Sequence, residues 1–263
     1  MRKIFLTILA LAALMFVACD EVGQADRLTY VEPPEVSRAV LIEDFTGQYC
    51  VNCPRATEEI ERLVEEYGDT AVIAVAIHSG PFSKSQGTFT PLYTAQGDEY
   101  FNHWGLSAQP IGLVDRLFSS TPFDFTDWAG AVNYELGIKA PVSIWVDAFL
   151  DDNDEVDVSV EVIGLDSALV KGKLQLWMVE DSIDSFQLMP GGGREEHYNH
   201  MHVFRAALNG AWGDDLSVNH GEVFQKNYSF PMDPSWEPDH CAIVAFVYDE
   251  DGVKQVIKCK LDY

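Results

Sequence analysis

Basic residues are scarce in this chain of 263 residues. It has 17 Lys and Arg against 42 Asp and Glu, which gives a formal net charge of −25 at pH 7. Such an acidic surface repels phosphate groups, which excludes binding to nucleic acid or anionic lipid headgroups through a basic patch. Disorder of the whole chain is also excluded, because 47% of the residues are hydrophobic and 12% are aromatic, enough for one large or two modest cores.

Cysteine is rare as well. The chain has five cysteines, too few for a small domain held together by disulfides. They fall into three groups, which are Cys19, Cys50 with Cys53, and Cys241 with Cys259. The last two lie nearly opposite each other on the arms of a predicted terminal hairpin, residues 241–248 and 253–260. They are candidates for a structural disulfide, with two buried thiols as the alternative, because the pairing depends on the register of the turn.

The longest apolar run extends from Ile4 to Ala18 and follows Arg2 and Lys3. It is shorter than the roughly 20 residues that cross a membrane as a helix, and it matches an export signal. The stretch 16–19, FVAC, resembles the lipobox of bacterial lipoproteins, in which cleavage leaves a lipid-bearing cysteine at the mature N-terminus. We therefore expect a lipoprotein signal peptide over residues 1–18, a lipid on Cys19 and an acidic tether over 19–36. An ordinary secretory signal with an incidental cysteine is the alternative.

The remaining chain shows two kinds of pattern. Residues 37–138 alternate predicted strands at 38–45 and 70–78 with predicted helices at 54–68 and 125–137, which favours parallel strands joined by a crossover. A stretch near 79–105 has the composition of an insertion. Residues 139–263 contain short runs rich in β-branched and aromatic residues, separated by turns, which predicts an all-β sandwich; the strand candidates are 140–150, 154–164, 171–181, 223–230 and 240–248.

A Cys-X-X-Cys motif, Cys50 to Cys53, lies between the first predicted strand and the first predicted helix. The unpaired N–H groups and the dipole at a helix N-terminus favour the thiolate of a cysteine there, and the thiolate is the attacking form. Cys53, one turn further on, can attack the resulting mixed disulfide and release the product. Pro54 suits the first turn of a helix, where its missing N–H costs nothing.

This arrangement resembles the thioredoxin fold. The strand 41–45 and the loop 46–49 lead into the cysteines with the spacing of that family, and Gln109-Pro110 precedes the apolar segment 111–114 as the family's cis-proline does. The resemblance implies that Asp44 takes the proton of Cys53 and that Pro110 lines a substrate groove. It implies an α/β thioredoxin-like domain over residues 37–138.

Some of these residues also fit chemistries other than redox activity. The Cys-X-X-Cys motif could be half of a zinc site or a static disulfide. The cluster His197, His200 and His202 could offer metal ligands, but no cysteine or carboxylate lies at a supporting spacing, so packing is favoured and no metal is expected. The segment 191–194, GGGR, lacks the Lys-Ser/Thr ending of a phosphate loop, so no nucleotide and no other cofactor is expected.

A whole-chain resemblance joins these features. The lipoprotein signal, the stretch Thr46 to Pro54, and the string Tyr198 to Arg205 followed by Gly213 resemble the outer-membrane-protein-twenty-eight type of bacterial lipoprotein. The resemblance implies a thioredoxin-like domain followed by an all-β immunoglobulin-like sandwich over 139–263, on a lipid anchor. It implies a role in surface binding as well.

The resulting hypothesis is a lipid-anchored protein of a Gram-negative cell envelope, expected at the outer membrane. Cys50, Cys53, Asp44 and Pro110 would carry out thiol–disulfide exchange on envelope or surface proteins, as a weak oxidant or a reductant, because acidic surroundings disfavour a further thiolate. The alternative is a surface adhesin or protein-binding module in which the Cys50–Cys53 disulfide is static, because a fold does not fix a function.

Overall fold

The computed structural model describes residues 36–263. The expected signal peptide, Cys19 and all but the last residue of the expected tether lie outside the described residues. No helix among residues 36–263 is long and apolar enough to cross a membrane.

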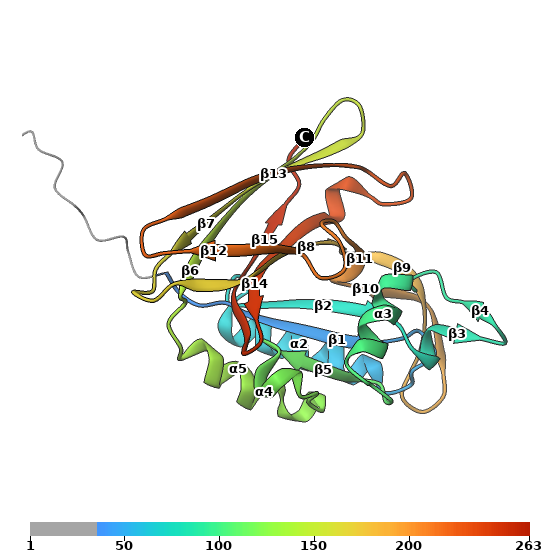
Figure 1. Cartoon of the computed structure of the whole chain (residues 1–263). Coiled ribbons are helices and arrows are strands. Elements are labelled where there is room, and N and C mark those ends of the chain that lie inside the picture. Colours follow the sequence, from blue (N-terminus) through green and yellow to red (C-terminus); the bar gives the residue numbers. More distant parts are fainter. Residues whose placement is uncertain (1–35) are drawn as a thin grey trace, which may run out of the picture. The chain divides into compact units, whose positions relative to one another are not determined.

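The N-terminal half of the described chain is built on three strands with two helices packed on one face (Figure 1). Strand β1 (Val40–Thr46) lies parallel to β2 (Val72–His78) and antiparallel to β5 (Ile111–Val114). Helix α2 (Cys53–Tyr67) connects β1 to β2, and α5 (Trp128–Leu136) follows β5. The predicted strand, helix and crossover are thus confirmed. Both helices pack on one face of these strands, where Ile60 and Leu63 of α2 meet Ile42 and Val72.

Short elements fill the segments between these strands. The expected insertion contains η3 (Pro81–Ser83), β3 (Lys84–Ser85), β4 (Thr88–Phe89) and α3 (Ala95–His103). After β5 come α4 (Leu117–Ser120) and η4 (Phe125–Asp127). The turn of α4 is left-handed at Phe118 and Ser119, which have positive φ angles.

The rest of the chain is almost entirely β-structure. The predicted strands are present, together with four that the sequence did not predict, β9 to β12. In chain order the elements are β6 (Val142–Leu150), β7 (Glu155–Gly164), β8 (Val170–Glu180), β9 (Ile183–Leu188), β10 (Arg194–His200), β11 (Val203–Ala207), β12 (Asp214–Val218), β13 (Val223–Pro231), η5 (Pro238–His240), β14 (Cys241–Asp249) and β15 (Gly252–Lys260).

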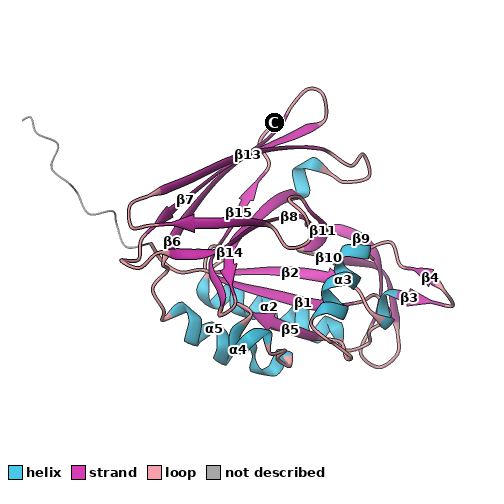
Figure 2. Cartoon of the chain, viewed as in Figure 1, coloured by secondary structure: helices cyan, strands magenta, loops and turns pink. Residues whose placement is uncertain are grey.

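The expected fold class, an α/β thioredoxin-like domain followed by an all-β immunoglobulin-like sandwich, is wrong. Strands dominate the described chain (Figure 2). An eight-stranded sheet has the order β15-β14-β8-β11-β2-β1-β5, with β12 also paired to β8, so it contains strands from both halves of the chain. The seam is the parallel pairing of β11 with β2, where Val203 lies opposite Ala76 and the Ala76 N–H donates to the carbonyl of His202 at 2.8 Å.

The physical reason for this continuity is a shared core. Leu41 and Phe45 of β1 and Val75 of β2 belong to the same buried cluster as Trp177 of β8 and Phe246 of β14. The strands of the N-terminal half therefore bury one face under α2 and α5 and the other under strands of the C-terminal half. Neither face could be left in water without exposing a continuous apolar surface.

The other large sheet has the order β13-β7-β6. Its valines alternate inward along β6 and β7 and pack against Leu174 and Leu176 of β8 and Ile243 of β14. One face of the eight-stranded sheet near β8 and β14 is thereby covered. Alternation of inward and outward residues is the pattern from which these strands were predicted.

Cys241 and Cys259 do not pair. Both are free thiols on the final hairpin, where Cys259 lies opposite Ile243, two residues after Cys241. This register answers the question that the sequence left open, in favour of two thiols. Burial raises the pKa of the Cys241 thiol to about 12, so it stays protonated at neutral pH.

Candidate functional site

The Cys-X-X-Cys motif lies in the turn between β1 and α2. Cys50 and Cys53 form a disulfide with a Cα–Cα distance of 5.4 Å. The Cys50 N–H donates to the carbonyl of Gly47 at 3.0 Å, which forms the turn, and Cys53 begins α2 with Pro54 directly after it. The residues therefore adopt the strand–turn–helix arrangement that a reactive cysteine pair requires.

Both cysteines are buried in spite of this surface position. Cys50 and Cys53 are each 2% exposed, while Val51 between them is 38% exposed. The cover comes from the hairpin of β9 and β10, which belongs to the C-terminal half (Figure 1). Its turn uses Gly191 and Gly192, both at positive φ.

Two glutamines attach this hairpin to the cysteine turn. The Gln187 side chain donates to the carbonyl of Cys50 at 2.9 Å, and the Gln48 side chain donates to the carbonyl of Phe186 at 2.8 Å. The Leu188 N–H donates to the carbonyl of Gln48 at 2.9 Å. An edge-to-face contact between Tyr49 and Phe186, with centroids 5.2 Å apart, adds an apolar contact. Together these contacts hold the hairpin against the cysteine turn.

Asp44 lies beneath the motif in a cavity of about 20 Å³. The residues that line the cavity come from β1, α2, β2, β9, β10 and the residue after β10; they are Asp44, Thr46, Cys53, Pro54, Thr57, Ala76, His78, Gln187, Tyr198, His200 and Met201. The register of β1 on β2 pairs Asp44 with Ala76 and Thr46 with His78, so these four residues share one face of the sheet. The structure thus brings Asp44 and Cys53 to one enclosed space.

The cavity is a site of strong desolvation. Burial raises the pKa of Asp44 to about 8. Burial lowers the pKa of His200 to about 4 and, helped by the charges of His200 and Arg205, lowers the pKa of His78 well below its ordinary value. Asp44 is therefore mostly protonated and both histidines are neutral at pH 7. Groups with pKa values displaced in these directions are typical of proton-transfer sites.

Pro110 lies at the same end of the sheet. Its peptide bond with Gln109 is cis, and because Ile111 is paired with Phe45, Pro110 lies alongside the end of β1. The Gln109 side chain donates to the carbonyls of Thr46 and Ser79 and accepts from the Phe82 N–H at 3.3 Å. Gln109 thereby holds the insertion against the end of β1.

The three histidines of the HYNHMH segment point to different partners. His197 is exposed and forms an ion pair with Asp184 at 3.0 Å, which raises its pKa. His202 contacts Asp181 at 2.9 Å, and His200 faces the cavity. Over residues 36–263 no three His, Cys, Asp or Glu side chains come together as a metal site. The glycines of GGGR form the turn of the hairpin.

Several residues at the site were missed from the sequence. The sequence holds a weak indication of His78, because it is a polar residue at the end of a buried strand that lies beside the strand of Asp44 and Thr46. Gln48 and Gln187 had none, because Gln48 contacts Phe186 and Gln187 contacts Cys50 only when the hairpin lies against the cysteine turn.

The comparisons with known proteins agree with an envelope protein. The family model "Outer membrane protein Omp28" matches residues 97–263. The chain belongs to the Omp28 family. This Omp28 protein is accordingly a protein of the cell envelope, in a family named for the outer membrane. No curated protein matches it.

Solved structures resemble this Omp28 protein over most of its length. HBP35 of Porphyromonas gingivalis is 17% identical, with a TM-score of 0.66 over 86% of this chain and 76% of its own. Protein AGR_C_4864 from Agrobacterium tumefaciens is 14% identical, with a TM-score of 0.51 over 86% of this chain and 95% of its own. A domain of the outer membrane lipoprotein Omp28 from Porphyromonas gingivalis is 27% identical over 47% of this chain and 97% of its own, with a TM-score of 0.35. At these identities the first two show likeness of fold only.

Proposed function

We propose that this Omp28 protein exchanges thiols and disulfides with other proteins of the cell envelope. Cys50 attacks or is attacked, Cys53 resolves the mixed disulfide, Asp44 accepts or returns the proton of Cys53, and Pro110 lines the groove for the partner chain. The observation that carries the proposal is that Cys53 and a buried Asp44 line the same cavity. A disulfide that is only structural has no need of an acid–base group beside it.

Reversible reduction of Cys50–Cys53 is the expected result. In graded glutathione or dithiothreitol buffers, thiol trapping and mass spectrometry on the folded protein should give a potential within roughly −270 to −120 mV, the range of exchange catalysts. With a disulfide-containing model peptide, Cys53→Ser should accumulate a mixed disulfide through Cys50, and Cys50→Ser should not. A bond that resists reduction until the protein unfolds would contradict the proposal.

Access to the disulfide requires the β9–β10 hairpin to shift, because both cysteines are covered in the closed arrangement. We expect Gln187→Ala to speed reduction by a small thiol roughly 5- to 30-fold, since it removes about 1–2 kcal/mol of hydrogen bonding that holds the hairpin closed. Stopped-flow reduction checks this rate. Gln225→Ala, at an exposed position of β13, is the matched control, and equal rates in both variants would show that the hairpin does not limit access.

We propose that a lipid on Cys19 anchors the protein to the membrane. The folded part of the chain then meets its envelope partners without crossing the membrane. Radiolabelled palmitate should enter the wild-type protein in cells and should be absent from Cys19→Ser. The variant should move from the membrane fraction to the soluble fraction, because several acyl chains are needed for stable anchoring. Palmitate labelling that persists in Cys19→Ser would contradict lipid attachment at Cys19.

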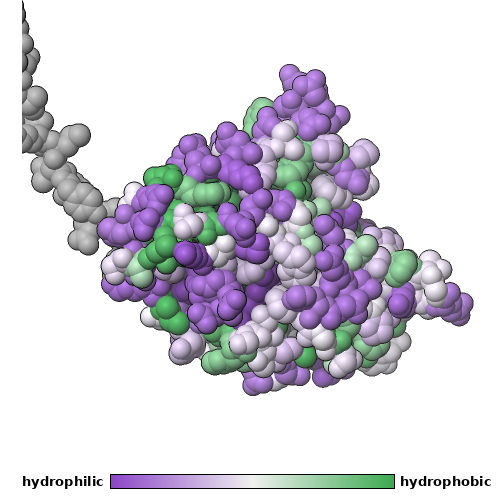
Figure 3. Space-filling model, in the orientation of Figure 1, coloured by the Kyte–Doolittle hydropathy of each residue, from purple (hydrophilic) through white to green (hydrophobic). Residues whose placement is uncertain are grey.

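A surface groove favours a second candidate function, a binding module. The groove measures about 790 Å³ and combines aromatic walls from Trp104, Trp212 and Tyr248 with Lys171 and Glu250 at its rim, a size and mixture typical of ligand sites. The face shown in Figure 3 interleaves polar and apolar residues. If binding is the function, the double variant Cys50→Ser with Cys53→Ser should retain its envelope partners in a pull-down; under exchange it should lose those held through sulfur.

A further inference from the structure

Asp44 can act as a base only after it loses its own proton. Its side chain is enclosed, with the residue 1% exposed, and burial keeps it mostly protonated at neutral pH. A proton on an enclosed carboxyl cannot pass directly to bulk water. If the proposed exchange takes place, a route for this proton must exist within the protein.

The cavity beside Asp44 contains unused hydrogen-bonding atoms. Oδ1 of Asp44 and Nδ1 of His78 are both buried, and neither has a hydrogen-bond partner among residues 36–263. Buried polar atoms are rarely left unsatisfied, and a bound water is a common partner for them. The cavity of about 20 Å³ has room for one water.

A second imidazole, that of His200, lies next to His78 and extends the row of polar groups. The ring of His200 lies edge to face with that of His78, with centroids 5.2 Å apart, and Tyr198 lies 4.8 Å from His200 on the same strand. Nε2 of His200 faces the carbonyl of Phe186 at 3.3 Å, so this nitrogen carries the proton. His200 is 5% exposed and Tyr198 is only partly buried, so the row leads outward.

We infer that His78 and His200 are the proton route of Asp44, with one water joining Oδ1 of Asp44 to Nδ1 of His78. A neutral imidazole accepts at one nitrogen and releases from the other, so it passes a proton on without holding a charge in the interior. His78 acts on Cys53 only through Asp44 and is therefore a positioning residue, as is His200.

The steps balance in atoms and charge. In the mixed disulfide, the Cys53 thiol gives its proton to the Asp44 carboxylate, and the Cys53 thiolate attacks Sγ of Cys50. The Cys50–Cys53 bond forms, the bond from Cys50 to the partner breaks, and the electron pair leaves on the partner sulfur, which takes a proton from solvent. The proton on Asp44 then passes through the water, His78 and His200 to solvent, which restores the Asp44 carboxylate.

Other charged groups near this route shape its pH dependence. Arg205 of β11 acts on His78, and Asp184 of β9 acts on His200. Glu58 and Glu61 of α2 act on Tyr198, as does Asp44. The acidic groups of α2 and β9 therefore act near His200 and Tyr198. Their negative charge favours the movement of a proton from Asp44 toward the surface.

The test compares His78→Gln with His78→Leu in the full-length protein. Glutamine can hold the water but cannot relay a proton, whereas leucine can do neither. We expect both variants to slow the attack of Cys53 on a Cys50 mixed disulfide by about tenfold, below the 10²–10⁴ of a whole acid–base step, and to change its pH profile. His197→Asn, at an exposed histidine of β10, the strand of His200, should match the wild type.

Infrared spectroscopy supplies a readout that does not depend on activity. The carboxylic acid band of Asp44 is the band lost in Asp44→Asn. It should shift in His78→Leu, where the water is lost, and stay in place in His78→Gln. If the wild type shows no exchange at all, the proposed function fails and the band still decides the route. An unshifted band in His78→Leu, or a wild-type pH profile in His78→Gln, would overturn the inference.

Discussion

Replacing Asp44 with asparagine should slow the attack of Cys53 on a Cys50 mixed disulfide by roughly 10²- to 10⁴-fold, the usual contribution of a positioned acid–base group. The substitution keeps the size of the side chain and removes its ability to carry a proton. Cys53 would then have to lose its proton while 2% exposed, beside a cavity with room for one water. The release of a chromophoric aryl thiolate from a Cys50 adduct measures this step.

The same substitution should remove part of the pH dependence of stability. The folded-state pKa of Asp44 is raised to about 8, so between its unfolded pKa and 8 the folded protein binds more protons, and the free energy of unfolding falls as the pH rises. Below about pH 6.5, His78 and His200 oppose this trend, because their lowered pKa values leave them uncharged only in the folded state. The Asp44 contribution should therefore be visible from about pH 6.5 to 8, with a slope of at most about 1.4 kcal/mol per pH unit.

Urea unfolding of the oxidised protein over this pH range checks the sign and the size of the slope. Asp147→Asn, on the exposed side of β6, is the matched control and should keep the wild-type slope. Fast exchange in Asp44→Asn, together with an unchanged slope, would show that the carboxyl serves neither the chemistry nor the titration assigned to it.

The local part of the site could be predicted because it depends on short sequence distances. The turn from β1 into α2 places Cys50, Cys53 and Pro54 through helix geometry, and Asp44 lies in the strand that leads into it. Because successive side chains of a strand point to opposite faces, the positions along β1 and β2 fix which residues share a face. These features require only periodicity and turn chemistry.

The enclosure of the site could not be predicted, because it depends on pairing between distant strands. The attachment of β11 to β2 and of the β9–β10 hairpin to the cysteine turn joins residues more than a hundred positions apart. Periodicity shows that a strand has a buried face but does not show what buries it. The expected division into two folds failed for this reason, since both halves present apolar faces that pack on each other.

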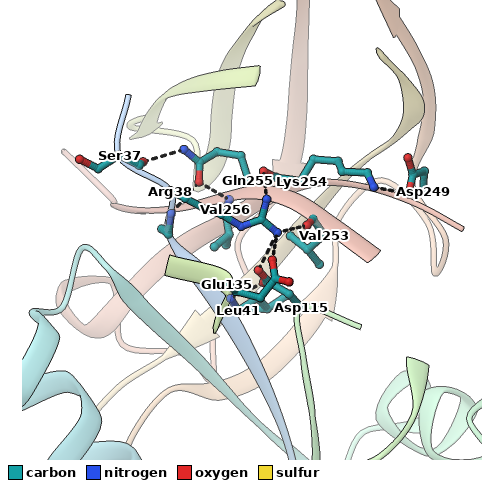
Figure 4. Close-up of polar contacts among 11 residues, drawn as sticks. Ser37, Arg38, Leu41, Asp115, Glu135, Asp249, Val253, Lys254, Gln255 and Val256 are labelled. Atoms are coloured by element: carbon teal, nitrogen blue, oxygen red, sulfur yellow. Dashed lines mark hydrogen bonds and ion pairs between the residues drawn. The ribbon is translucent and has the colours of Figure 1, made fainter. Parts of the chain in front are cut away.

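Arg38→Met should lower the free energy of unfolding by about 3–5 kcal/mol, the usual cost of removing one partner from a buried ion pair. Arg38 lies before β1 at 8% exposure and forms ion pairs with Asp115, at 3.0 Å, and with Glu135 (Figure 4). It also donates to the carbonyls of Val253, at 2.6 Å, and Lys254, at 3.2 Å, and so ties β15 to the start of β1. Methionine fills similar space but leaves two carboxylates buried together.

The decrease in the free energy of unfolding of Arg38→Met should depend on pH. The direction of this dependence distinguishes the loss of a buried charge from the loss of packing. Burial raises the pKa of Asp115 to about 7 against the opposing charge of Arg38, and loss of that charge raises it further. A carboxyl with a raised folded-state pKa stabilises the fold when protonated, so the deficit of Arg38→Met should shrink as the pH falls from 8 toward 5. Arg62→Met, which removes exposed pairs with Glu59 and Glu66 on α2, should change stability little at either pH. A deficit in Arg38→Met that is equal at both pH values would assign the effect to packing instead of to the buried charges.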